Sequence, residues 1–183
     1  MYALFHPQHL TEETREKIKD FCALWEQGEN VKIKTSGSTG NPKELSFTKD
    51  QLIASARKTL DYFSLNETCT ALLCLSLETI GGKMMLVRAL IIGLELDILT
   101  PSSHLDDLQL DKKYDFVAIV PLQAENSLAK LHQFKKILVG GAKVSDDEFI
   151  NLDKMKGLAY KIDRKGNIIW TFGENNELVK PQF

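Results

Sequence analysis

A strand, a helix and a second strand are predicted by residues 71–99, which read ALLCLSLETIGGKMMLVRALIIGLELDIL. Residues 71–77 form an unbroken apolar run, as expected of a strand that is covered on both faces. Residues 80–93 are apolar over a length suited to a helix, and residues 95–99 again read as a strand. Strands that alternate with helices of this length are typical of a parallel sheet.

The same alternation continues toward the C-terminus. The predicted elements are a short helix at 105–110, a strand at 115–120, a helix at 122–134, a strand at 136–139 and a helix at 145–155. We therefore predict an α/β fold, with a mostly parallel sheet and helices on both of its faces. Ligands of such sheets gather at the carboxyl ends of the strands, where we expect the loops after Lys34, Leu77, Val120 and Val139.

Upstream, an amphipathic helix is predicted over residues 11–27, with Gly28 as its end, followed by a strand at 31–34. Residues 48–51 read as a capping box that opens a helix ending near Phe63. Near the C-terminus, residues 160–170 are predicted to form a hairpin. We divide the chain into an α/β domain at 1–156 and a hairpin with a tail at 157–183, without a C-terminal lid domain.

The composition narrows the possible functions. The chain has 183 residues and 43% hydrophobic residues, which fits one domain. Its net charge of −2 argues against a basic surface of the kind that binds nucleic acid. Its most apolar stretch, residues 84–96, contains Arg88 and Glu95 and is too short to cross a bilayer. Three cysteines in apolar stretches favour reduced thiols and a cytoplasmic location. Four scattered histidines show no spacing of metal ligands, so no protein-held metal is predicted.

The strongest motif is residues 35–43, which read TSGSTGNPK. Hydroxyl groups, glycines that let backbone amides approach a ligand, and one cation suit a phosphate-like anion. The other interpretation is a flexible polar loop. A Walker-type phosphate loop is excluded, because Pro42 precedes Lys43 and Glu44 follows it, where that motif needs Gly-Lys-Ser/Thr at a helix start.

This string resembles the phosphate-binding signature of the adenylate-forming (acyl-/aryl-CoA ligase) superfamily. The resemblance implies the fold of part of that family's N-terminal domain, with ATP, Mg²⁺, coenzyme A and a small carboxylic acid as partners. It also implies a loop that holds the ATP phosphates. The phosphate-binding residues would be Thr35, Ser36, Gly37, Ser38, Thr39, Gly40 and Lys43.

Residues 75–89, LSLETIGGKMMLVRA, look like the strand, loop and helix that form one wall of the family's acyl pocket. Within this stretch, residues 82–89, GKMMLVRA, are especially similar to compact o-succinylbenzoate–CoA ligases of menaquinone biosynthesis. The substrate of those enzymes has a second carboxylate, for which Lys83 and Arg88 are the candidate cations beside Gly82. For Arg88 the alternative is a snorkelling or ion-paired residue in an apolar helix. The Met84-Met85 pair is interpreted as core packing.

Two further segments are similar to the family, namely VPLQ at 120–123 and VGGA at 139–142. The resemblance places Gly140, Gly141 and Ala142 against the acyl group and the adenine, where glycine avoids a clash. Gln123 is a candidate for a hydrogen bond to substrate. A polar residue at a helix start also needs no such role.

The resemblance covers about residues 30–155. The family's later segments, with a Mg²⁺-binding Glu and a lid lysine, are not recognisable; TFGE at 171–174 begins like one of them but lacks its Thr-Glu. Three alternatives stay open: an AMP-forming acid ligase, a non-catalytic nucleotide- or acyl-binding remnant of one, and an unrelated phosphate-binding domain. A shortened sheet would expose apolar surface, which favours homo-oligomers.

Overall fold

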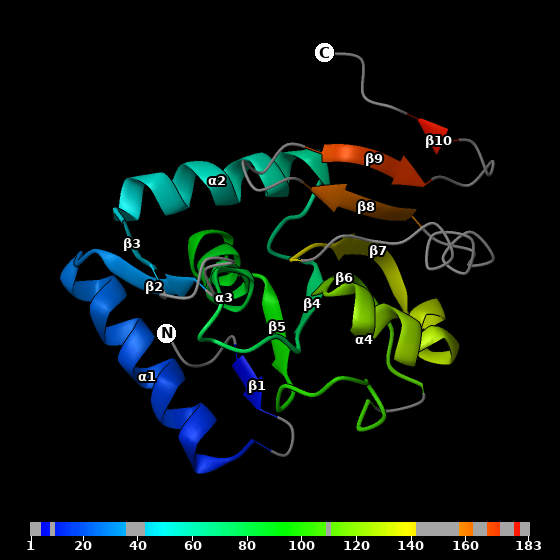
Figure 1. Ribbon diagram of the computed structural model, residues 1–183, viewed down its shortest axis with the longest axis horizontal. Helices are drawn as coiled ribbons and strands as arrows, with labels where there is room; N and C mark the ends of the chain where they lie inside the picture. The colour runs from blue at the N-terminus through cyan, green and yellow to red at the C-terminus, as the bar shows by residue number, and fades with distance from the viewer. Residues whose placement is uncertain are drawn as a thin grey trace.

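The computed structural model describes residues 5–7, 10–35, 43–108, 111–141, 158–162, 168–172 and 178–179. Within them lie an 8-stranded sheet, in the order β1-β5-β4-β6-β7-β8-β9-β10, and a 2-stranded sheet of β2 and β3 (Figure 1). The strands of the large sheet are β1 (Phe5–Pro7), β4 (Thr70–Leu73), β5 (Glu95–Ile98), β6 (Tyr114–Ile119), β7 (Phe134–Val139), β8 (Leu158–Ile162), β9 (Ile168–Phe172) and β10 (Leu178–Val179).

The large sheet is parallel from β1 to β8. Each neighbouring pair in that part runs in the same direction, for example Ala71 of β4 beside Leu96 of β5 and Phe116 of β6. Only β9 and β10 are added in antiparallel fashion. The predicted mostly parallel sheet is thus confirmed.

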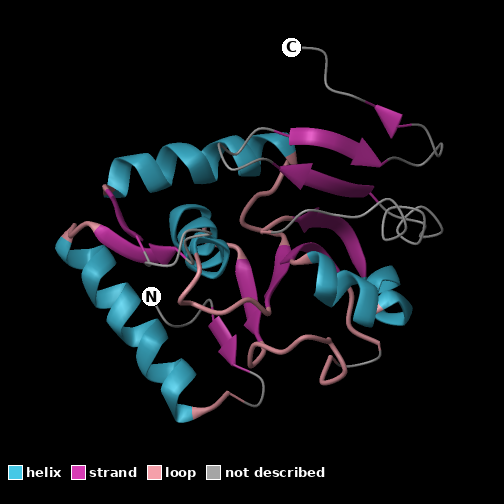
Figure 2. Cartoon of the chain, in the orientation of Figure 1, coloured by secondary structure: helices cyan, strands magenta, loops and turns pink. Residues whose placement is uncertain are grey.

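Helices cover both faces of this sheet (Figure 2). On one face, α1 (Glu12–Gln27), α2 (Lys49–Tyr62) and α3 (Ile80–Ile92) share a hydrophobic core with β4, β5 and β6. On the other face, α4 (Pro121–Asn126) and the 3₁₀ helix η2 (Leu128–Gln133) close a second core. Burial on both faces explains why the strands read as continuous apolar runs.

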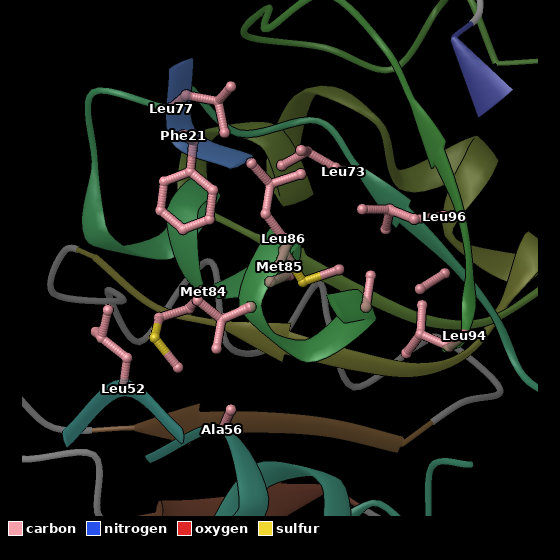
Figure 3. Close-up of a cluster of buried hydrophobic side chains, with 14 of the residues drawn as sticks. Phe21, Leu52, Ala56, Leu73, Leu77, Met84, Met85, Leu86, Leu94 and Leu96 are labelled. Carbon is pink, nitrogen blue, oxygen red and sulfur yellow. The ribbon is translucent and has the colours of Figure 1, made fainter. Parts of the chain in front are cut away.

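The centre of the first core is α3, whose side chains meet those of α1, α2, β4 and β5 (Figure 3). Met84 and Met85 are 5% and 1% exposed, which confirms them as core residues. Phe21 of α1 and Leu52 of α2 belong to the same cluster. A helix that is buried almost all round cannot be amphipathic, which is why α3 lacks a polar face.

The predicted helix ends are confirmed. Thr11 caps α1 by accepting from the backbone of Thr14, and Gly28 ends it in the left-handed region at φ 72°. At the start of α2, the Thr48 hydroxyl accepts from the backbone of Gln51, and the Gln51 amide accepts from the backbone of Thr48.

Several local predictions differ from the structure. Residues 105–108 form a turn instead of a helix, with Leu105 and Leu108 buried in the second core. The predicted helix at 122–134 is split at Ser127, whose buried hydroxyl accepts from the backbone of Leu105. The predicted helix at 145–155 lies outside the described residues.

The predicted C-terminal hairpin is present as β8 and β9, but it also extends the large sheet, because β8 pairs in parallel with β7. The division into residues 1–156 and 157–183 stays a prediction. Among the described helices, none is both long and apolar enough to traverse a bilayer.

Candidate functional site

The motif at 35–43 closes a β-hairpin. Strands β2 (Val31–Thr35) and β3 (Lys43–Phe47) are antiparallel, and Thr35 and Lys43 are directly opposite each other as Cα partners. The prediction that the strand before the loop belongs to the parallel sheet is therefore wrong. A second strand, β3, separates the loop from α2, and it pairs back on β2.

The rest of the motif lies outside the described residues. This holds for Ser36, Gly37, Ser38, Thr39 and Gly40, and also for Ala142 near the other predicted segment. The phosphate-binding role of the loop stays a prediction. The structure describes only the backbone of its two end residues, Thr35 and Lys43.

The hairpin is seated on the first core beside α3. Val31 and Ile33 are 1% and 4% exposed and pack into the core that contains α1, α2 and α3. In Figure 1 the hairpin lies between α1 and α2, apart from the large sheet. From α3, the Lys83 ammonium donates to the Lys32 carbonyl of β2 over 3.3 Å.

The first turn of α3 is packed tightly on the turn that follows β4. The Thr79 hydroxyl donates to the Ser76 carbonyl at 2.7 Å and accepts from the Gly82 backbone at 3.2 Å. A Cβ at Gly82 would lie 2.3 Å from the Ser76 carbonyl oxygen, closer than real atoms approach. Gly82 thus has a packing role at the helix start, and its predicted place in an acyl pocket remains a prediction.

The carboxyl ends of β4, β6 and β7 lie side by side, as predicted for the loops after Leu77, Val120 and Val139. The Gly140 backbone donates to the Ile119 carbonyl at 3.0 Å. Gly141 has φ 90°, and a Cβ there would lie 3.2 Å from Val120 Cγ1. The structure therefore brings the predicted residues at 120–123 together with Gly140 and Gly141 at one edge.

The Gln123 side chain is used for structure. Its Nε2 donates to the Cys74 carbonyl at 3.0 Å and to the Ser102 carbonyl at 2.8 Å, and its Oε1 accepts from the Val120 backbone at 3.2 Å. Both amide hydrogens are thus engaged, and Gln123 is 3% exposed. This arrangement agrees with the alternative that Gln123 is a polar residue at a helix start without a role in substrate binding. It joins the turns after β4, β5 and β6 into one rigid edge.

Arg88 lies away from that edge, in the interface of α3 with α2 and β6. Its guanidinium donates to Thr59 Oγ1 at 3.2 Å and to Met85 Sδ at 3.5 Å, and lies 5.8 Å from the Phe116 ring centre. Burial lowers the pKa of Arg88 to about 10, and no described residue provides a hydrogen-bond partner for its Nε. Its predicted contact with substrate stays a prediction, and the side chain is 5% exposed.

Lys83 is the more accessible of the two candidate cations. Burial lowers the pKa of Lys83, the carboxylate of Glu78 acts in the opposite direction, and the charge of Lys17 lowers it further. Lys17 and Glu78 form an ion pair at 2.8 Å that joins α1 to the turn before α3. Three charged groups therefore surround the start of α3 next to the hairpin.

Two groups in this region, the Thr79 side chain and the Lys32 carbonyl, were not predicted from the sequence. The Thr79 cap has a recognisable signal, a Thr immediately before an apolar helix. The Lys32 carbonyl has none, because every residue carries a carbonyl and only the tertiary structure shows which one a lysine reaches.

In the described part of the chain, no group of three or more His, Cys, Asp or Glu side chains lies close enough together to hold a metal ion. The region instead combines cations and helix-start amides, which are groups that bind anions.

The class defined by this architecture is an α/β fold of the kind found in the N-terminal domain of adenylate-forming enzymes. An acyl-CoA synthetase (AMP-forming)/AMP-acid ligase II-like protein from Dyadobacter fermentans has a TM-score of 0.67 and 27% identity, over 95% of this chain and 62% of that chain. No family model matches the sequence, and neither does any curated protein.

Two further solved structures share the fold. The N-terminal subdomain of NpsA from Klebsiella oxytoca, in complex with 3-hydroxyanthranilyl-AMSN, has a TM-score of 0.63 and 20% identity over 84% of this chain. The o-succinylbenzoate CoA synthetase MenE from Bacillus subtilis, bound to the product analogue OSB-NCoA, has a TM-score of 0.61 and 18% identity over 79% of this chain. This chain covers 41% of the former and 32% of the latter. At 20% and 18% identity, these two structures show the fold alone.

Proposed function

We propose that this chain binds ATP and a small carboxylic acid as the N-terminal part of an AMP-forming acid ligase. The observation that carries the proposal is the hairpin, which presents the two ends of the predicted phosphate loop and is hydrogen-bonded to the first turn of α3. The 27% identity to an AMP-forming synthetase-like protein supports it. Such a placement gives the loop an anchored base from which to meet a triphosphate.

The proposed reaction is the attack of a substrate carboxylate on the α-phosphate of ATP, which gives an acyl-adenylate and pyrophosphate. Coenzyme A then displaces AMP to give a thioester. Both reactants of the first step are anions, so cations near the phosphates supply much of the rate enhancement. The loop hydroxyls, its backbone amides and Lys43 would bind the phosphates. Mg²⁺ would arrive with ATP and neutralise phosphate charge.

For the acid we propose an o-succinylbenzoate-like dicarboxylate, which would place the protein in menaquinone biosynthesis. The proposal rests on the resemblance of residues 82–89 to o-succinylbenzoate–CoA ligases. Of the two candidate cations there, only Lys83 retains access to solvent, since Arg88 is 5% exposed. We place the acyl group at the edge of the sheet where Gly140 and Gly141 follow β7 beside Val120.

The alternative within this lineage is a protein that binds nucleotide or acid without turnover. ATP–pyrophosphate exchange distinguishes the two. We expect exchange with o-succinylbenzoate, less with benzoate or a fatty acid, and none in a Lys43→Ala variant. Calorimetric ATP binding without exchange above the Lys43→Ala level would favour the non-catalytic alternative. No ATP binding at all would refute both.

A cytoplasmic location is proposed because the cysteines form no disulfide bonds. Cys22, Cys69 and Cys74 are all free, and burial raises the pKa of Cys74 to about 12, which makes that thiol unreactive. Reduced, buried cysteines are typical of proteins kept in a reducing compartment.

Self-association is proposed from the exposed apolar side chains Ile80 and Leu122, and a concentration series in analytical ultracentrifugation tests it.

A further inference from the structure

The hairpin of β2 and β3 depends on the rest of the molecule for its orientation. A two-stranded sheet alone is marginally stable in water, so its position has to be imposed by neighbours. The buried side chains of Val31 and Ile33 fix one face on the core. Leu45 on β3 is 43% exposed, and a cross-strand pair of Lys32 and Glu44 at 3.1 Å is also exposed.

One directed contact holds the hairpin backbone. The bond from Lys83 Nζ to the Lys32 carbonyl links β2 to α3 at 3.3 Å. Apolar packing is non-directional and permits small rotations. A charge-assisted hydrogen bond from a lysine restricts them.

The contact point is close to the loop. Lys32 is three residues before Thr35, the last residue of β2. At about 3.3 Å per residue, the loop therefore begins about 10 Å from the tether. A small rotation of the hairpin about its packed face is thus transmitted directly to the loop.

The ammonium of Lys83 is itself held in place by its surroundings. It is half-buried at the start of α3, and Glu78, which stabilises its charged form, is fixed by an ion pair to Lys17 of α1. Lys83 also lies one residue after Gly82, whose contact with the Ser76 carbonyl fixes the helix start. The donor is therefore attached to the packed start of α3, and the acceptor belongs to a two-stranded sheet outside the large one.

We infer that Lys83 is a positioning residue for polyphosphate binding, which acts through the Lys32 carbonyl by setting the angle of the hairpin. The inference rests on the proposed function of the loop. It differs from a direct contact with substrate, because it ties the effect of Lys83 to the β- and γ-phosphates and not to the acid. Misplacement by as little as 1 Å is enough to weaken such recognition strongly.

The test measures binding of ATP, pyrophosphate and AMP to the full chain by calorimetry. In Lys83→Met, which keeps the apolar stem, we expect affinity for ATP and pyrophosphate to fall about tenfold, the usual scale for one charged hydrogen bond. Affinity for AMP should stay within about twofold, because AMP lacks the terminal phosphates. Lys83→Arg retains a cationic donor and should restore binding to near the original level.

Lys130→Met is the matched control. Lys130 also donates to a backbone carbonyl at 3.3 Å, that of Leu108, and is likewise half-buried, but it lies on the other face of the sheet. We expect it to change thermal stability as much as Lys83→Met does, without changing any of the three affinities.

The outcomes separate the inference from the proposed function. If Lys43→Ala abolishes ATP binding while Lys83→Met binds ATP as the original protein does, the inference is wrong and the proposed function stands. An equal loss of affinity for ATP, pyrophosphate and AMP would show a general structural role and also overturn the inference. If Lys43→Ala binds ATP normally, the proposed function itself is wrong.

Discussion

Arg88 places a guanidinium inside the core without a carboxylate partner in the described part of the chain. A buried charge of this kind costs more than it contributes, whereas its aliphatic stem still packs. We therefore predict that Arg88→Met leaves the free energy of unfolding unchanged or raises it by up to about 2 kcal/mol. Arg88→Ala, which also removes the stem, should lower it by about 2–4 kcal/mol.

Urea unfolding of the two Arg88 variants measures this difference. Exchange activity of Arg88→Met provides an independent readout. A variant that folds well but loses exchange specifically with a dicarboxylic acid would show that the guanidinium reaches substrate, against the enclosure that the structure shows.

Asp115 gives the protein one acid-sensitive contact. Burial by itself would raise the pKa of Asp115, but hydrogen bonds from Lys135 at 2.7 Å and from the Thr70 backbone at 2.8 Å outweigh it and leave the pKa lowered. A carboxyl group with a lowered pKa stabilises the fold above its ordinary value of about 4, and this stability is lost as the pH falls through the folded value. Asp115→Asn should therefore flatten the decline in stability below about pH 4. Equal slopes in the pH profiles of both proteins would contradict this.

The contacts of a residue were predictable from the sequence where its partner lies within a few positions along the chain. The Thr48–Gln51 capping box and the Gly28 helix end depend on neighbours within four positions, so the sequence contains the whole interaction. The buried contact of the Tyr114 hydroxyl with Asp97, at 2.6 Å, joins β6 to β5, which follow each other along the chain but are separated by β4 in the sheet. No local pattern encodes such a pair.

At the scale of elements, α3 offers a matched pair of glycines. At Gly82 an added Cβ would lie 2.3 Å from the backbone oxygen of Ser76, which cannot move away cheaply. At Gly81 it would meet only the tip of Leu75, at 3.0 Å, and a flexible side chain can adjust. We predict that Gly82→Ala costs about 1–3 kcal/mol, the usual cost of overpacking. Gly81→Ala should be neutral or gain up to about 1 kcal/mol from helix propensity.

Thermal unfolding of both glycine variants checks this prediction. Equal effects would mean that α3 begins further from the turn after β4 than the structure shows. Because Lys83 follows Gly82, the Gly82 variant should also weaken ATP binding through a displaced helix start, whereas Gly81→Ala should not.

Two elements differ from the sequence-based prediction for different reasons. Strand β3 is polar, KELSF, and its partner is the preceding strand, so neither apolar content nor alternation with a helix marked it. The helix at 122–134 looked continuous because its composition is helical throughout. The Ser127 hydroxyl accepts a hydrogen bond from the Leu105 backbone, and the helix breaks there, because this tertiary contact overrides local propensity.

At the scale of the whole molecule, the parallel sheet followed from the alternation of apolar strands and helices, since parallel neighbours need a long crossover connection, which is usually a helix. The strand order did not follow from it. Strand β1 joins the far edge beside β5, and β8 extends the opposite side beside β7. The candidate site shares this limit: its residues at 120–123 and 140–141 were predictable as strand-end loops, whereas the tether of the hairpin to α3 required the folded chain.

The stability of the whole chain should respond to ATP, since a ligand that binds only the folded state raises the free energy of unfolding by mass action. At a concentration of 100 times the Kd this amounts to about 2.7 kcal/mol. For a chain of 183 residues, we expect the melting temperature to rise by about 5–10 °C. Without ATP, the Lys43→Ala variant should have a melting temperature close to that of the original protein. Adding ATP should not raise the melting temperature of this variant. A rise of the same size in that variant would place ATP elsewhere on the molecule, because the hairpin loop would then contribute nothing to the binding energy.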